Sequence, residues 1–451
     1  MNIDRKDIDR EDIDREDCLS TARELIGFLE KSPTCFHAVQ SIADCLEEAG
    51  FTQLHEGEKW ELTEGGSYYV TRNGSSIVSF KVPGKAFSGF QIMASHSDSP
   101  SFKIKENPEM EAENHYVKLN VEKYGGMLCA PWFDRPLSVA GRLAVKEGNR
   151  IATKLVKVDR DLLMIPNLAI HFNREVNDGY KYNAQVDMLP LYGGADAKGT
   201  FMETVAESAG VKKEDILGHD LYLYNRVPGS IWGASGEFLS CGRLDDLQCA
   251  FSTLKGFLEG GHPDCVSVHA VFDNEEIGSL TKQGADSTFL EDVLRRINSA
   301  MGRSGEEYLM AIASSFMVSA DNAHAAHPNH GDKSDPVNRP YMNEGIVIKY
   351  STKYATDGLS AAVFRAVCQE EGIPCQAFTN RSDMAGGSTL GNISNSHVAL
   401  NTVDIGLPQL SMHSPYETAG IKDTCYLIRA AKRFYSTSMK AMGSGSYEVR
   451  Q

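Results

Sequence analysis

Hydrophobic positions near the start of the chain recur every three or four residues, which is the period of an amphipathic helix. This pattern covers residues 19–29 and 38–49, and Gly50 ends the second run. Beyond it, β-branched and aromatic residues gather in short runs that predict strands. These runs are residues 67–72, 76–80 and 91–95. The chain therefore begins as an α/β domain at about residue 18.

The pattern changes between Phe102 and Ser235, where short apolar runs alternate with glycine, proline and asparagine turns. Few long helical periods occur in this stretch, so we expect it to be mainly β. After Glu237, helical and strand-like runs alternate again, as they do in α/β domains. We therefore predict a mixed-sheet α/β domain made from residues 18–100 and 237–451, with a β-rich domain inserted at residues 101–236.

The two ends of the chain carry little hydrophobic patterning. Residues 1–17 repeat a highly charged motif and are too poor in apolar side chains to bury a core, so we expect a flexible extension. A last helical pattern covers residues 423–436, and we expect a loose polar tail after it.

Composition narrows the possible partners. The 451 residues include 45 basic and 61 acidic side chains, a net charge of −16, which argues against nucleic acid and anionic membranes as partners. The N-terminus has no apolar signal segment, and no run reaches the ~18 apolar residues of a membrane span. The ten cysteines contain no CxxC pair and are expected to be free thiols. We expect a cytoplasmic protein.

The most informative stretch is an apolar strand-like run, residues 267–272, that leads to the adjacent glutamates Glu275 and Glu276. Neighbouring side chains at a strand end point in different directions. One carboxylate could therefore bind a metal while the other holds a water beside it. The alternative is a solvated acidic turn after the strand.

Other candidate ligands also follow strand-like runs or open helices. His96 and Asp98 are spaced so that the aspartate could orient the histidine ring. Asp245 opens a helical pattern and could instead be a simple cap. Open α/β sheets collect ligands at the carboxyl ends of strands, where such residues can converge. The remaining candidates of this kind are Asp321 and His413.

Two histidines and several carboxylates suit zinc, manganese or cobalt. Three ligating carboxylates and one base give a charge of about −4, which two divalent ions would balance, and a pair of metals can activate a water between them. His171 also follows an apolar run, but by itself it indicates a hydrogen-bonded core or turn histidine. Lys349 ends a strand-like run with a cation.

Several segments, taken in order, resemble those of the M18 family of metallo-aminopeptidases, the aspartyl aminopeptidases. The resemblance runs from about Ile26 through His413. Each segment is unspecific alone, but their joint occurrence in family order is very specific. The segments are Ser32-Pro-Thr-Cys-Phe-His-Ala-Val39, Tyr68-Tyr-Val-Thr-Arg-Asn73, His96-Ser-Asp-Ser-Pro100, Tyr124-Gly-Gly126, Trp132-Phe-Asp-Arg135, Arg243-Leu-Asp245, Asp273-Asn-Glu-Glu-Ile-Gly-Ser279, residues 319–329 and Met412-His-Ser414.

The resemblance implies a zinc-exopeptidase-like catalytic domain and a role for each candidate. Two divalent metals would be bound, zinc first, with manganese or cobalt as alternatives. Asp245 would bridge them, with His96 and Glu276 on one metal and His413 and Asp321 on the other. Glu275 would be the general base that takes a proton from the bridging water and passes it to the leaving amine. Asp98 would support His96.

The resemblance also implies an assembly and a substrate. The inserted domain would mediate dimer contacts within a homododecamer, and His171 would reach a neighbouring subunit's site to stabilise the oxyanion. Lys349 and Tyr354 would lie beside the substrate side chain and favour N-terminal Asp or Glu of peptides. One alternative is an aminopeptidase of neutral or broad specificity. Another is a catalytically silent assembly or cargo protein, which the intact set of candidate ligands disfavours.

Overall fold

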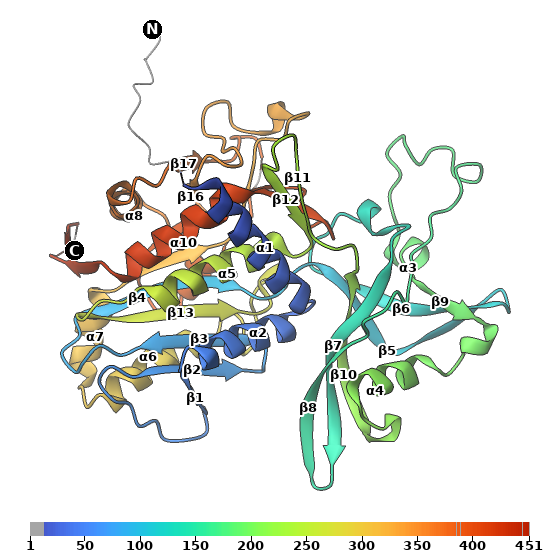
Figure 1. Cartoon of the computed structure of the whole chain (residues 1–451), viewed down its shortest axis with the longest axis horizontal. Helices are drawn as coiled ribbons and strands as arrows, with labels where there is room; N and C mark the ends of the chain where they lie inside the picture. Colours follow the sequence, from blue (N-terminus) through green and yellow to red (C-terminus); the bar gives the residue numbers. More distant parts are fainter. Residues whose placement is uncertain (1–12, 385, 388, 444, 451) are drawn as a thin grey trace.

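The structure, a computed structural model, describes residues 13–384, 386–387, 389–443 and 445–450. A large sheet covered by helices occupies one side of the molecule, and a smaller sheet occupies the other (Figure 1). Most of the predicted charged extension, residues 1–12, lies outside the described residues. Its last residues are not an extension but part of helix α1 (Arg15–Lys31), which the side chain of Asp14 caps.

The large sheet is mixed, which confirms the predicted α/β class. Its central neighbours β13, β4, β14 and β18 are parallel, so their carboxyl ends meet at one edge. Every residue of β13 is buried, as expected for a strand covered on both faces. In order across the sheet, the nine strands are β1 (Thr52–Leu54), β2 (Ser67–Arg72), β3 (Ser76–Lys81), β13 (Cys265–Phe272), β4 (Gly89–His96), β14 (Phe316–Ala320), β18 (Asn401–Gly406), β16 (Ile346–Lys349) and β17 (Cys375–Phe378).

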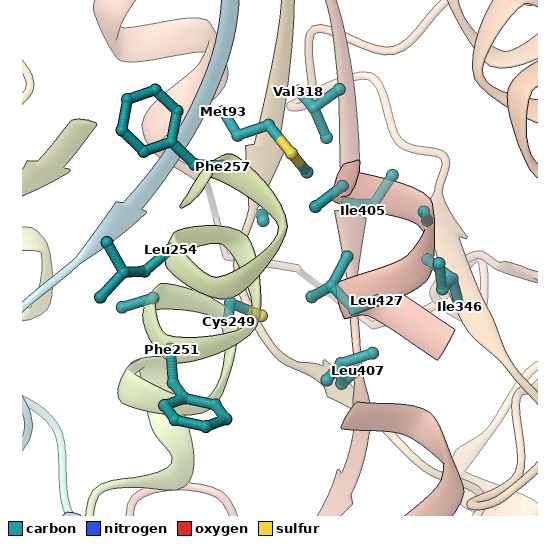
Figure 2. Close-up of a cluster of buried hydrophobic side chains, with 14 of the residues drawn as sticks. Met93, Cys249, Phe251, Leu254, Phe257, Val318, Ile346, Ile405, Leu407 and Leu427 are labelled. Carbon is teal, nitrogen blue, oxygen red and sulfur yellow. The ribbon is translucent and has the colours of Figure 1, made fainter. Parts of the chain in front are cut away.

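Helices cover both faces of this sheet and bury separate apolar clusters. On the first face, Figure 2 shows Leu254 and Phe257 of α5 in one buried cluster with Leu427 of α10 and with Met93 and Val318 of the sheet. The helices of this face are α1, α2 (Cys35–Glu48), α5 (Leu244–Glu259), α8 (Gly358–Glu370) and α10 (Ile421–Tyr435). On the second face lie α6 (Phe289–Ala300), α7 (Gly305–Ala313) and α9 (Leu390–Ser394).

A second, antiparallel sheet comes entirely from the stretch between β4 and β13. Helix α4 (Phe201–Ala209) packs Phe201 and Val205 into its core. The segment before the short helix α3 (Ala184–Asp187), residues 166–180, extends away from both sheets (Figure 1). That residues 101–236 form a separate inserted domain remains a prediction. The strands are β8 (Arg150–Lys157), β7 (Leu137–Glu147), β10 (Ile216–Asn225), β5 (Ser101–Ala112), β6 (Tyr116–Tyr124) and β9 (Leu191–Gly194).

Two features differ from the sequence-based expectation. The predicted loose tail is a hairpin of β21 (Ser438–Ala441) and β22 (Tyr447–Arg450), anchored because Met439 is buried in the main core. A five-stranded sheet, not predicted, lies beside the large one. It consists of β11 (Ser230–Trp232), β12 (Phe238–Cys241), β20 (Glu417–Gly420), β19 (Pro408–Leu410) and β15 (Ala323–His324).

Among the described residues, none of the helices combines the length and the apolar character needed to cross a membrane.

Candidate active site

Three groups of candidate residues converge at the carboxyl edge of the large sheet. His96 is the last residue of β4, and Asp321 directly follows β14. Glu275 and Glu276 form a short 3₁₀ turn after β13. We call residues 273–279 the glutamate turn. Because these strands are parallel neighbours, their ends place the side chains together, as predicted.

Asp245 and His413 reach the same place by a different route. Asp245 follows β12 of the five-stranded sheet and begins α5 with a non-helical backbone. His413 lies in the turn between β19 and β20, in the left-handed region with φ +66°. Glu417 joins them, since its carboxylate accepts backbone N–H hydrogen bonds from both residues, 2.7 Å from His413 and 3.1 Å from Asp245.

Asp245 lies between the two histidines. Its Oδ1 is 3.3 Å from Nε2 of His96, and its Oδ2 is 3.7 Å from Nε2 of His413. His413 Nε2 also lies 3.3 Å from Oε2 of Glu276. A carboxylate that offers one oxygen to each histidine has the arrangement needed to bridge two metal ions.

The distances divide the other ligands differently from the expectation. Asp245, Glu276 and His413 bring ligand atoms within 4.8 Å of one another, and His96 forms a similar group with Asp246 and Asp321. The expected pairing put Glu276 with His96 and Asp321 with His413. Only the first of those pairs occurs in any close group, and there it includes Glu275. The geometry therefore favours His413 with Glu276 and His96 with Asp321.

The donor set fits divalent metal ions. Histidine and carboxylate groups are suitable ligands, and Oε1 of Glu276 is buried without a hydrogen-bond partner. Burial, reinforced by neighbouring carboxylates, raises the pKa of Glu276 and of Asp321. Burial alone would raise the pKa of Asp245 too, but its hydrogen bond with His96 and the charges of His96, His413 and Lys349 together outweigh burial and lower it. So many acidic groups out of water call for cations between them.

Asp98 supports the glutamates as well as the histidine. Its Oδ1 accepts the backbone N–H of Glu275 at 3.1 Å, and its Oδ2 accepts that of Glu276 at 3.2 Å. Nδ1 of His96 lies 3.0 Å from the backbone oxygen of Asp98 and 3.4 Å from its carboxylate. The expected support of His96 thus comes mainly from the main chain, and the carboxylate anchors the glutamate turn.

The carboxyl group of Glu275 has a raised pKa. Burial raises the pKa of its carboxyl to about 8, the carboxylates of Asp321 and Asp98 add to the shift, and His96 opposes it. A carboxylate with a raised pKa accepts protons more readily at neutral pH than an ordinary surface glutamate does.

A pocket of about 410 Å³ opens over this cluster. Nζ of Lys349, on β16, lies 3.6 Å from Oδ2 of Asp321, and the lysine side chain is only 5% exposed. The lysine reaches the site past Gly406, where an added Cβ would come within 3.0 Å of its Cε. Burial would lower the pKa of Lys349, but Asp321 and other neighbours outweigh burial and raise it. Other residues of the wall are Tyr354, Phe378, His324, Thr389 and Met412.

His171 is not among the residues that line this pocket. It lies on the projecting segment, residues 166–180, where it is exposed next to Phe172, which is 80% exposed.

Sequence reasoning missed several residues that contact the predicted ones. Glu417 carried a signal only as an acidic residue four positions after His413. No role was predicted for Asp246, yet it accepts the backbone N–H groups of His96 and Asn322. No role was predicted for His324 either, an exposed residue of β15 that lines the pocket.

The chain matches known proteins along most of its length. The family model of the Aminopeptidase I zinc metalloproteases (M18) matches residues 28–435. A probable M18 family aminopeptidase 2 of Clostridium acetobutylicum is 47% identical over 429 residues, which cover 93% of this chain and 99% of that protein. The protein of the same name from Pseudomonas aeruginosa is 41% identical over 425 residues, 92% of this chain and 97% of the relative.

Solved structures agree. Ape4 in the cryo-electron microscopy structure of the Ape4 and Nbr1 complex superposes with a TM-score of 0.90 at 34% identity, covering 93% of this chain and 86% of that chain. The S. cerevisiae mApe1 dodecamer gives a TM-score of 0.79 at 29% identity over 92% of this chain and 96% of that chain. The chain therefore belongs to the M18 family of aminopeptidases, hydrolases that the family model describes as zinc metalloproteases.

Proposed function

We propose that this aminopeptidase uses two divalent metal ions, zinc first, and Glu275 as general base to remove N-terminal residues from peptides. The observation that carries the proposal is the position of Glu275. Its half-buried carboxylate lies in the wall of the pocket, within reach of the clustered ligands, and no lysine or arginine pairs with it among the described residues.

Five residues would hold the metals. Asp245 would be shared, His413 and Glu276 would complete one position, and His96 and Asp321 the other. When bound, such ions polarise a carbonyl oxygen and lower the pKa of water. Zinc is consistent with the family, and manganese or cobalt would suit the same ligands.

Glu275 would take a proton from the attacking water and deliver it to the amine that leaves. The raised pKa of this carboxyl supports both halves of that transfer, because the group must be ionised first and protonated next. Asp98 would keep the glutamate turn in place through its bonds to the backbone N–H groups of Glu275 and Glu276.

The proposed preference is for N-terminal Asp or Glu. It rests on Lys349, a buried ammonium group in the pocket wall with Tyr354 beside it, which could pair with an acidic substrate side chain. One observation favours the alternative of neutral or broad specificity. Lys349 already lies 3.6 Å from Asp321, and the aromatic rings of Tyr354 and Phe378 offer apolar contact.

We further propose that the enzyme assembles into a homododecamer built from dimers. The relative mApe1 of S. cerevisiae is a dodecamer in its solved structure. The exposed apolar side chains of Leu168, Ile170 and Phe172 support a role for the projecting segment in subunit contact. His171, in the middle of this segment, would enter a neighbouring subunit's pocket and donate a hydrogen bond to the oxyanion.

We also propose a cytoplasmic location. All ten cysteines are free thiols, which fits the reducing cytoplasm.

Glu275→Gln tests the function directly. This change keeps the size of the side chain and removes the base, so we expect turnover to fall by about 100-fold or more while bound metal stays at the parental level. Full turnover in the metal-loaded variant would reject Glu275 as the base. A parent protein that binds metal yet cleaves no aminoacyl substrate would favour the silent assembly or cargo protein.

A further inference from the structure

A turn of the six-stranded sheet lies against the glutamate turn. It begins at Tyr124, the last residue of β6, and ends at Leu128. We call residues 124–128 the tyrosine turn. The hydroxyl of Tyr124 donates to Oδ2 of Asp98 at 2.7 Å and accepts from Nδ2 of Asn274 at 2.8 Å. Burial, strengthened by the charge of Asp98, raises the pKa of Tyr124, so the phenol keeps its proton for this bond.

Both partners of Tyr124 support the backbone that carries the glutamates. Asp98 accepts the N–H groups of Glu275 and Glu276. Asn274 precedes Glu275 in a left-handed conformation with φ +63°. The Asn274 side chain also connects the glutamate turn to the segment that follows it. Its Oδ1 accepts hydrogen bonds from Thr281 at 2.7 Å and from Gln283 at 2.9 Å.

The next residues of the tyrosine turn contact the proposed metal ligands more directly. Gly125 has φ +77°, and a Cβ added there would lie 3.1 Å from Cβ of Glu276. The backbone N–H of Leu128 donates to the carbonyl oxygen of His413 at 3.1 Å. A single turn therefore contacts both sides of the group formed by Glu276 and His413.

We propose that the tyrosine turn couples the six-stranded sheet to the reaction centre, with Tyr124 as a positioning residue that acts through Asp98 on Glu275 and Glu276. The inference rests on the roles proposed above for the two glutamates. It gives the six-stranded sheet, whose projecting segment we assign to subunit contact, a direct hydrogen-bonded path to the catalytic base. A displacement of this sheet on assembly would reach the glutamates through the Tyr124 hydroxyl.

Tyr124→Phe removes that hydroxyl alone. It leaves the buried Nδ2 of Asn274 without its acceptor and takes one donor from Asp98. We expect kcat to fall about 10-fold with KM within about 2-fold, because a small displacement of a catalytic group slows the chemical step. We also expect the full-length enzyme to lose zinc at about 10-fold lower chelator concentration from one of its two positions.

Tyr69→Phe is the matched control, since Tyr69 also donates to a carboxylate, that of Glu47, at 2.5 Å and contacts none of the proposed ligands. This variant should keep parental kcat and zinc retention. Equal losses in both variants would reduce the role of Tyr124 to general stability and overturn the proposal.

A double variant tests the route. If Tyr124 acts through Asp98, adding Tyr124→Phe to Asp98→Asn should change kcat by less than about 2-fold, and full additivity would contradict the route. Should Tyr124→Phe fail to assemble, Gly125→Ala probes the contact of the same turn with Glu276. Gly148→Ala is its control, because Gly148 has φ +63° in the β7–β8 hairpin with open space around it. Gly125→Ala alone should impair zinc retention, and parental retention would sink the proposal.

The readouts separate this inference from the proposed function. Zinc retention depends on the position of Glu276 and is measured without turnover. If Glu275→Gln stays active, the base assignment fails, whereas a loss of zinc specific to Tyr124→Phe would still support the coupling of the turn to the ligands.

Discussion

Oε1 of Glu417 accepts a 2.7 Å hydrogen bond from the backbone N–H of His413, which fixes the left-handed turn that presents the histidine. The other oxygen accepts from the backbone N–H of Asp245, so one buried carboxylate connects the proposed bridging residue to a proposed ligand of one metal position. Glu417 is placed for this by β20, which pairs with β12 in the register Cys241↔Glu417.

Glu417→Gln should weaken metal binding more than it weakens the fold. One of the two acceptor oxygens becomes an amide NH₂ facing a backbone N–H, at a cost of about 1.5–3 kcal/mol. We expect zinc retention to fall about 10-fold or more. The matched control is Asp423→Asn, another buried carboxylate, which accepts the backbone N–H groups of Asn343 and Gly345 away from the pocket. Similar zinc loss in both variants would contradict a specific role for Glu417.

Lys349→Met should shift substrate preference. Without the ammonium group, the ratio of kcat/KM for Asp over Leu aminoacyl substrates should fall about 10-fold or more, because the charge opposite an acidic side chain is lost. A panel of chromogenic aminoacyl substrates measures the ratio. Lys432→Met, which removes an exposed lysine paired with Glu259, should leave it unchanged. If the parent already prefers Leu, the role given to Lys349 is wrong.

His171 can be tested by mixing two inactive subunits. Co-assembled His171→Ala and Glu275→Gln chains should regain about a quarter of parental activity, because random dimers contain some sites with both groups intact. The control mixture of His413→Ala and Glu275→Gln should stay inactive, since both changes affect residues of the same chain's pocket. Activity recovered equally in both mixtures, or in neither, would contradict a role for His171 in a neighbouring site.

His269, buried in β13, should make the fold sensitive to acid. Burial lowers the pKa of its ring to about 4 from 6.5, so the folded protein binds fewer protons than the unfolded chain between these pH values. Stability present above pH 6.5 is therefore lost as the pH falls towards 4, by about 2 kcal/mol at pH 5.

His269→Phe keeps a ring stacked on Phe257 and removes the titration. Between pH 7.5 and pH 5, the unfolding free energy of the variant should fall by about 2 kcal/mol less than that of the parent. Chemical denaturation at the two pH values measures the difference. Parallel losses in the two proteins would show that His269 does not cause the acid sensitivity.

Hydrophobic patterning predicted the strands of the large sheet well because those strands are buried on both faces. The runs at β2, β3, β4 and β13 were found within two residues. The carboxyl-end rule for parallel sheets then brought His96, the two glutamates and Asp321 together correctly.

The rule did not account for Asp245 and His413. They lie beside strands of the five-stranded sheet. Its strands have at most four residues, so they leave no periodic signal in the sequence. The sequence likewise could not predict which ligands pair, His413 with Glu276 and His96 with Asp321. This pairing depends on distances between segments more than 100 residues apart in the chain. Glu417 and Tyr124 form hydrogen bonds to backbone and side-chain groups. Such bonds leave no recognisable spacing in the sequence, so neither residue could be predicted.

The order of the ligands along the chain has a consequence for protein synthesis. His96 is made early, but His413 and the helix α10, which packs on α1 and α5, come last. A nascent or truncated chain that ends before residue 413 lacks one proposed ligand and the helix that closes the core. We therefore expect incomplete chains to have no peptidase activity, so that activity begins only after synthesis of the whole catalytic domain.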